Sequence, residues 1–125
     1  MVVIDTSVLI DYLRRPEDPE TFFAEFVSLN KSNLAISMLT IQELYSGKSS
    51  KEGEKEKLFL EIITSMEILP YTYQIAKLAG EIFRDRRENM GFADAAIAAT
   101  AILNKASLLT LNKKDFKGIK NLKLI

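Results

Sequence analysis

The 125-residue chain contains no cysteine and no histidine, and it has only five glycines and three prolines. Without cysteine the protein has no disulfide framework, no thiolate nucleophile and no thiolate metal site. The lack of histidine excludes imidazole as a base or ligand, and with it every Ser–His or Cys–His mechanism. The low glycine and proline content excludes a collagen-like or linker-dominated chain. If the protein is an enzyme, carboxylates, amines, hydroxyls or a metal ion must therefore carry the chemistry.

Long apolar runs are also missing from the sequence. No run approaches the ~18 residues that a membrane-spanning helix requires, and Asp5 interrupts the N-terminal apolar segment too early for a secretory signal. We therefore expect a cytoplasmic protein with no membrane partner. Apolar types make up 47% of the residues and charged types 27%, which is ordinary globular composition. We predict that residues 1–125 form a single domain.

Charge is balanced over the whole chain but not along it, because 17 basic and 17 acidic residues cancel. Residues 1–30 carry six acidic and two basic side chains, a balance of −4, whereas residues 112–125 carry five lysines and one aspartate, a balance of +4. A neutral total argues against a general nucleic-acid coat. It is compatible with an enzyme whose acidic site lies beside basic edges that hold phosphate.

Hydrophobic periodicity predicts strands that alternate with helices. The expected strands are 2–4, 34–36, 68–69, 107–111 and 122–125. The expected helices are 7–15, 22–29, 39–46, 58–66, 75–88 and 92–103. Residues 48–57 are expected to form a solvated loop that runs into the following helix, with a mobile flap as the alternative, and residues 112–115 a turn. This alternation predicts an α/β fold in which a mostly parallel sheet is covered by helices on both faces.

Four carboxylates occur where such a sheet would bring them together. Asp5 ends the first strand, Glu43 lies just beyond the second, and Asp115 follows the fourth. Asp94 is the only charge in the apolar helix 92–103, and an ionised carboxylate near a core needs a partner. In open α/β folds the functional site lies beyond the carboxyl ends of the strands. These four acids are therefore the candidate catalytic residues.

Each acid also has a purely structural explanation. Asp5 and Asp115 are residue types that cap helices or close turns. The segment 40–43 reads as a capping box, in which Glu43 would bond back to the amide of the first residue. Asp94 would complement the positive end of its helix. Considered one at a time, each acid is better explained by these local roles.

Two polar residues that follow Asp5 have open roles as well. Ser7 either hydrogen-bonds a site carboxylate or simply occupies the first turn of the helix. Asp11 lies on a polar helix face and is expected to be structural.

Considered together, the four acids favour a metal centre. Carboxylates within a few ångströms repel one another, which raises their pKa values unless cations bind between them. Oxygen ligands without histidine or cysteine select Mg²⁺ or Mn²⁺ over Zn²⁺. Such ions support phosphodiester hydrolysis without a protein base, which removes the difficulty that the lack of histidine presents.

Four sequence blocks resemble those of PIN-domain nucleases, and in particular the small ribonucleases that are the toxins of VapBC-type toxin–antitoxin pairs. The blocks are residues 3–11, 40–44, 92–101 and 109–116, in the family's order and over essentially the whole chain. The resemblance implies a three-layer α/β/α fold around a parallel sheet and an endoribonuclease that depends on Mg²⁺ or Mn²⁺. It also implies an RNA substrate, a homodimer and a cognate antitoxin.

The resemblance assigns roles to individual residues. The acidic quartet, which would be catalytic and bind metal, matches Asp5, Glu43, Asp94 and Asp115. The polar positions that support the quartet match Ser7, Thr110 and Asn112. Basic residues near the four blocks are candidates for contacts with substrate phosphates: Arg14, Arg15, Arg84, Arg86, Arg87, Lys113 and Lys114.

Two alternative functions compete with this interpretation. A phospho-accepting receiver domain needs adjacent acids after the first strand, but Thr6 and Ser7 follow Asp5, and Lys113 matches its required lysine only loosely. A PIN-like scaffold that binds RNA or protein without cutting is the other alternative. Its usual signature is the loss of one quartet acid, and all four are present here.

Overall fold

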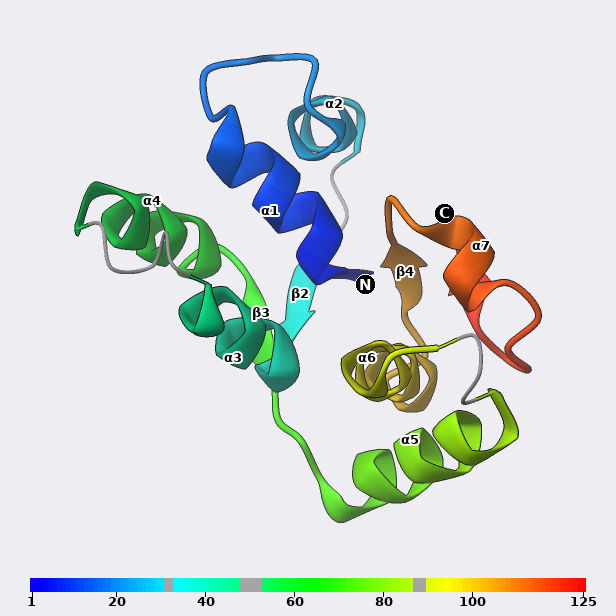
Figure 1. The fold of residues 1–125 in the computed structure, drawn as a ribbon. Helices are drawn as coiled ribbons and strands as arrows, with labels where there is room; N and C mark the ends of the chain where they lie inside the picture. Colours follow the sequence, from blue (N-terminus) through cyan, green and yellow to red (C-terminus); the bar gives the residue numbers. More distant parts are fainter. Residues whose placement is uncertain (31–32, 48–52, 87–89) are drawn as a thin grey trace.

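A computed structural model describes residues 1–30, 33–47, 53–86 and 90–125 (Figure 1). The strands of this part of the chain are β1 (Val2–Ile4), β2 (Leu34–Ser37), β3 (Glu67–Leu69), β4 (Ser107–Leu109) and β5 (Lys123–Leu124). Its helices are α1 (Thr6–Arg14), α2 (Phe22–Leu29), α3 (Met38–Ser46), α4 (Gly53–Ile63), α5 (Tyr73–Arg86), α6 (Phe92–Leu103) and α7 (Lys113–Phe116). None of these helices is both long and apolar enough to cross a membrane.

The five strands form one sheet in the order β3-β2-β1-β4-β5, and all four pairings are parallel. Strand β1 lies in the middle, with Val3 opposite Ala35 of β2 and opposite Leu108 of β4. All three residues of β1 are buried, as is typical of a parallel strand that is covered on both faces. The carboxyl ends of the strands therefore meet at one edge of the sheet, where the chain leaves β1 at Asp5.

Helices cover both faces of the sheet, which confirms the predicted α/β/α architecture. Successive residues of a strand point to opposite faces. Val3, Ala35 and Leu108 accordingly pack in a cluster with residues of α5 and α6. Their neighbours Ile4 and Leu109 pack in a second cluster with residues of α1, α2 and α4. Two hydrophobic layers thus hold the sheet between them.

Helix α6 is the most buried helix of the fold. Every residue from Ala95 to Ala101 is buried, and most of them are alanine. Small side chains let α6 lie close to both the sheet and α5, which crosses beside it in Figure 1. Because Asp94 immediately precedes this buried run, packing of the helix places the carboxylate at the border of the core.

The boundaries of several elements differ from the predicted ones. Residues 113–116 form a short helix, not part of a turn, because Phe116 is buried and anchors the segment against the core. The fourth strand ends at Leu109 rather than residue 111, and the last strand is limited to two residues. Helix α4 already begins at Gly53, so the predicted loop is wrong for residues 53–57, whereas residues 48–52 lie outside the described part.

Candidate active site

The register of β1 and β4 builds the centre of the site. Ile4 pairs with Leu109, so the next residues of the two strands, Asp5 and Thr110, also lie side by side. The Thr110 hydroxyl donates a hydrogen bond to Oδ2 of Asp5 at 2.7 Å. The hydroxyl of Ser7, the second residue of α1, donates a hydrogen bond to the same oxygen at 2.7 Å. Asp5 is only 2% exposed, so these two bonds stabilise a buried carboxylate.

Backbone amides orient both of these hydroxyls. Oγ of Ser7 accepts a hydrogen bond from the Leu111 amide at 3.3 Å, and Oγ1 of Thr110 accepts one from the Asn112 amide at 3.0 Å. Each hydroxyl oxygen accepts a hydrogen bond from an amide, so the hydroxyl's own hydrogen is directed to Asp5. Asn112 thus contributes through its backbone, and its own side chain is exposed.

Asp5 occupies the N-cap position of α1, but it does not act as a helix cap. In the described part of the chain its side chain makes no capping hydrogen bond to the backbone. Both hydrogen-bond partners of the carboxylate are hydroxyl groups, and both donate to Oδ2, so Oδ1 receives no hydrogen bond from the described residues. Helix capping, the structural role that the sequence suggested for Asp5, therefore does not explain its side chain.

The predicted capping box at residues 40–43 is wrong. Helix α3 begins at Met38, and the cap is Ser37 at the end of β2, whose hydroxyl accepts a hydrogen bond from the Leu39 amide at 3.1 Å. Thr40 is therefore already inside the helix and has no cap role. The carboxylate of Glu43 is free to bond elsewhere, and its Oε1 accepts a hydrogen bond from the Thr6 hydroxyl at 2.7 Å.

Thr6 and Thr40 are two site residues that the sequence analysis missed. Both are buried, and their hydroxyl oxygens lie 3.1 Å apart. Thr6 directly follows Asp5, so one short segment orients both the acid that follows β1 and an acid on α3: Ser7 bonds Asp5 and Thr6 bonds Glu43. The signal was the pair of consecutive hydroxyl residues after a strand-end aspartate, since a threonine at the buried start of a helix needs a polar partner.

Asp94 connects the acids electrostatically. The pKa of this half-buried carboxyl is raised from 3.8 to about 6, first by burial and then by the negative charges of Asp5, Glu43 and Asp115. A hydrogen bond from the Gly91 backbone acts in the opposite direction. Asp94 therefore does complement its helix terminus, as predicted. The charged groups that raise the pKa of Asp94 are the other three predicted acids.

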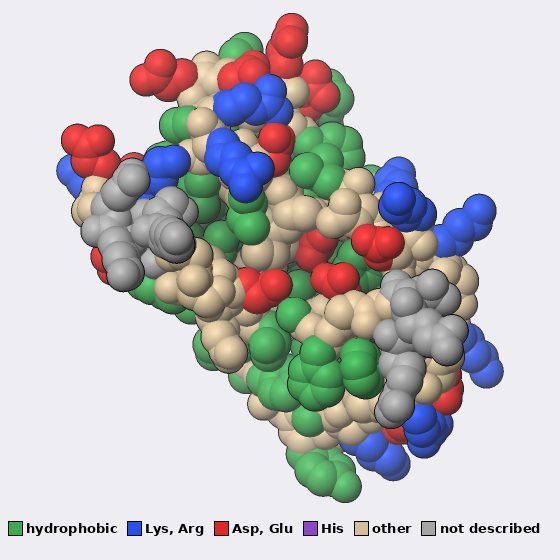
Figure 2. Space-filling model, viewed as in Figure 1, with side chains coloured by type: hydrophobic (Ala, Val, Ile, Leu, Met, Phe, Trp, Pro, Cys, Tyr) green, Lys and Arg blue, Asp and Glu red, His purple; other side chains and the backbone are tan. Residues whose placement is uncertain are grey.

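Asp115 lies in the first turn of α7, where its amide donates to the Asn112 carbonyl at 2.9 Å. Its side chain is partly buried. In Figure 2 acidic side chains gather in the middle of one face, where the ends of α1, α3, α6 and α7 meet, and basic side chains lie to either side, over the far end of α1 and over α7. The site is thus an acidic centre with basic flanks.

The basic candidates differ in what they contact. Arg15 pairs with Asp11 at 2.8 Å and with Asp18 at 3.0 Å, which also confirms the structural role of Asp11. Arg84 pairs with Asp85 at 3.1 Å, and the two Nη atoms of Arg86 bond backbone carbonyls. Arg87 lies outside the described residues. The exposed candidates that flank the acidic centre and form no ion pair within the described part of the chain are Arg14, Lys113 and Lys114.

The donor set fits a hard divalent cation by its chemistry. Among the described residues, the hydrogen bonds and charges at this centre join carboxylates with hydroxyls, and oxygen ligands suit Mg²⁺ and Mn²⁺. Among the described residues, no three acidic side chains already stand in an arrangement that could hold a metal ion. Carboxylates that repel one another are expected to stand apart until a cation draws them together.

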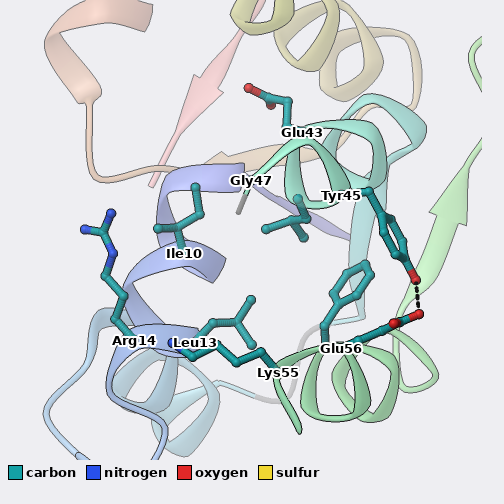
Figure 3. Close-up of a pocket in the computed structure, with 10 residues that line it drawn as sticks. Ile10, Leu13, Arg14, Glu43, Tyr45, Gly47, Lys55 and Glu56 are labelled. Carbon is teal, nitrogen blue, oxygen red and sulfur yellow. Dashed lines mark hydrogen bonds between the residues drawn. The ribbon is translucent and has the colours of Figure 1, made fainter. Parts of the chain in front are cut away.

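A mostly apolar pocket adjoins the acidic centre (Figure 3). It has a volume of about 340 Å³ and lies between α1, α3 and α4. Its walls include Ile10 and Leu13 of α1 and Phe59 of α4, and the cations Arg14 and Lys55 stand at its rim. Glu43 belongs to both places, because it lines the pocket while its carboxylate points away from the other lining side chains in Figure 3 and its charge acts on Asp94. A partner seated here would lie next to the acidic centre.

Comparisons with known proteins agree with this geometry. The PIN domain family matches residues 2–122. Ribonuclease VapC1 of Rickettsia felis is 32% identical and covers 99% of this chain and 94% of its own length. Ribonuclease VapC10 of Mycobacterium tuberculosis is 32% identical, with 98% and 91% covered. The crystal structure of VapBC2 from Rickettsia felis, bound to a promoter DNA fragment, superposes with a TM-score of 0.82 at 27% identity, covering 100% of this chain and 98% of that one. The chain belongs to the PIN-domain family, among the VapC ribonucleases.

Proposed function

We propose that this protein is a divalent-metal-dependent endoribonuclease and the toxin of a toxin–antitoxin pair. The observation that carries the proposal is the hydrogen-bonded acidic centre beyond the strand ends, where Ser7 and Thr110 hold Asp5 and Thr6 holds Glu43. The charges of Asp5, Glu43 and Asp115 also act on Asp94, whose pKa burial and these charges raise to about 6. A partly buried carboxylate whose ionised form is disfavoured by three neighbouring acids is suited to a site that a cation completes. The ribonuclease names of the relatives support RNA as the substrate.

We assign Asp5, Glu43, Asp94 and Asp115 as the residues that would hold Mg²⁺ or Mn²⁺. A bound ion supplies Lewis acidity at the scissile phosphate. The hydroxyls of Ser7 and Thr110 keep Asp5 in a fixed orientation, and Thr6 does the same for Glu43. Preset ligand orientation lowers the cost of assembling the charged centre when substrate and cation arrive.

The basic flanks are assigned to substrate binding. Arg14 on one side and Lys113 and Lys114 on the other are exposed. An RNA strand that crosses the acidic centre would place its neighbouring phosphates on these cations, because phosphate contacts supply most of the affinity of such complexes. The acidic centre would then repel the RNA less, since a bound cation neutralises part of its charge.

The test is an endonuclease assay on single-stranded and structured RNA with chelator, Mg²⁺ or Mn²⁺. We expect cleavage only when a divalent ion is present. Melting curves recorded in parallel should shift upward with Mn²⁺, as for any ligand that binds only the folded state. Absence of both cleavage and a melting shift would favour the non-catalytic scaffold.

A protein antitoxin is the proposed partner, because the similar structures include VapBC2 of Rickettsia felis and a toxin–antitoxin complex from Klebsiella pneumoniae. We assign the pocket between α1, α3 and α4 to an apolar segment of this antitoxin. The walls of the pocket are mostly apolar, and Glu43 both lines the pocket and belongs to the acidic centre. A cationic side chain on that segment could pair with the acids and compete with the metal. The homodimer and the cytoplasmic location stay predictions.

Leu13→Glu tests the assigned docking pocket. A carboxylate on this wall would have to lose its hydration when an apolar segment binds, so we expect antitoxin affinity to fall by about 10²-fold or more. Calorimetric titration with the product of the neighbouring open reading frame measures this. Leu60→Glu, on an exposed position of α4 that does not line this pocket, is the control. Equal affinities of the two variants would contradict the assignment.

A further inference from the structure

Arg86 contacts the segment that carries Asp115 from a distant part of the chain. It is the last residue of α5, and its guanidinium reaches across to the chain that follows β4. Nη1 donates a hydrogen bond to the Lys117 carbonyl at 2.8 Å, and Nη2 donates a longer one to the Asp115 carbonyl at 3.4 Å. Figure 1 shows the end of α5 beside the loop that follows α7.

The two carbonyls need an external partner. Helix α7 has four residues, and the last carbonyls of a helix lack partners within it. A helix of this length is also too short to be stable by itself. At Lys117 the backbone is already extended, with φ of −62° and ψ of 135°. Arg86 therefore supplies the C-terminal cap of α7, with a positive charge at the negative end of the helix.

The surroundings of the guanidinium indicate a fitted contact. Gly118 adopts a φ of +85°, and a Cβ atom at that position would lie 3.3 Å from Nη1 of Arg86. The absence of a side chain there leaves room for the guanidinium. Nε is buried and has no hydrogen-bond partner among the described residues. Since an unpaired buried donor is unfavourable, the bonds of the two Nη groups determine where this side chain lies.

We infer that Arg86 is a positioning residue for Asp115: by capping α7 it fixes the turn from which that carboxylate reaches the acidic centre. The inference rests on the proposed metal-dependent function. It also differs from a phosphate-binding role for Arg86, because its Nη groups are engaged by backbone carbonyls. Arg86 contributes no ligand and acts only through Asp115.

The main test compares Mn²⁺ affinities by calorimetric titration. Arg86→Met keeps an unbranched apolar side chain but removes all donors, and it should weaken Mn²⁺ binding by about 10-fold or more. Arg84→Met is the matched control, because it removes an exposed arginine from the same helix and that arginine pairs only with Asp85 among the described residues. The control should bind Mn²⁺ like the wild type, and Arg86→Lys should recover part of the lost affinity.

A double-mutant cycle separates positioning from general destabilisation. In an Asp115→Asn background, Arg86→Met should change the Mn²⁺ dissociation constant by less than about twofold, because the residue through which it acts is already impaired. Equal weakening in both backgrounds would overturn the inference, as would an Arg86→Met protein with wild-type affinity.

Two further outcomes are distinguishable. If the wild type itself does not bind Mn²⁺, the proposed metal site is wrong, and the role of Arg86 is overturned with it. If Arg86→Met does not fold, Arg86→Lys decides: an affinity about threefold below the wild type supports the inference, and an unchanged affinity overturns it. Amide hydrogen exchange of residues 113–119 in the metal-free protein should be faster in both Arg86 variants than in Arg84→Met.

Discussion

Asp94→Asn should abolish metal-dependent RNA cleavage, with a loss of about 10³-fold or more, and at the same time stabilise the metal-free protein. Burial and the charges of the other three acids raise the pKa of this carboxyl to about 6, so its ionised form is unfavourable in the metal-free protein. Asparagine has nearly the same shape but no charge, so it relieves the repulsion while it weakens metal binding. Cleavage rates in Mn²⁺ and melting temperatures in chelator measure the two effects.

The stability gain should depend on pH in a definite direction. The pKa of Asp94 is raised from 3.8 to about 6 in the folded protein, so the folded state binds the Asp94 proton more tightly than the unfolded state does. This contribution to the free energy of unfolding is fully present below about pH 4 and is lost as the pH rises through about 6. At pH 7.5 the asparagine variant should therefore be more stable than the wild type by about 1–2 kcal/mol, a value reduced for partial solvent exposure. The difference should shrink toward pH 5.

Asp11→Asn is the matched control for this experiment. Asp11 pairs with Arg15 on a solvent-exposed helix face, so its replacement should change stability by less than about 1 kcal/mol and leave the pH dependence of the wild type intact. An Asp94→Asn protein that cleaves RNA at the wild-type rate would contradict the assigned role. A metal-free protein that Asp94→Asn destabilises at pH 7.5 would instead show that helix capping dominates its energetics.

Glu43→Gln should lower RNA cleavage by about 10²-fold and Mn²⁺ affinity by about 10-fold, because an amide oxygen is a poorer ligand for a hard cation than a carboxylate. Metal-free stability should be unchanged or increased. The glutamine oxygen can still accept the hydrogen bond of the buried Thr6 hydroxyl, and the replacement removes one of the charges that act on Asp94. Calorimetry, cleavage rates and thermal melting check the three quantities.

Two further variants separate the charge of Glu43 from its hydrogen bond. Glu43→Ala leaves the Thr6 hydroxyl without this acceptor and should destabilise the protein by about 1–3 kcal/mol, which Glu43→Gln should not do. Glu61→Gln, at an exposed position on α4, is the control for loss of one negative charge. Wild-type Mn²⁺ affinity and cleavage in the Glu43→Gln protein would limit Glu43 to a structural role.

Much of the fold was predictable because its signals are local. Alternating strand and helix patterns predict the parallel sheet with helices on both faces, and the topology and register confirm it. The same reasoning brings the acids together, since residues that follow parallel strands collect at one edge of the sheet. Short elements were harder to predict, because they contain too few residues to show a periodic pattern. Helix α7 has four residues and no periodicity, and it depends on burial of Phe116.

The sequence by itself determined which chemistry this protein can perform, because the lack of histidine and cysteine leaves carboxylates and hydroxyls at the strand ends. Only the tertiary structure decided how each acid is used. Glu43 had a plausible local role as part of a capping box, but its observed partner, Thr6, is 37 residues away in the chain. Thr110 and Asp5 are separated by 105 residues and meet only through the register of β1 and β4. Local patterns report caps and periodicity, whereas the charge environment of a site depends on contacts between distant segments, which form only when the chain packs.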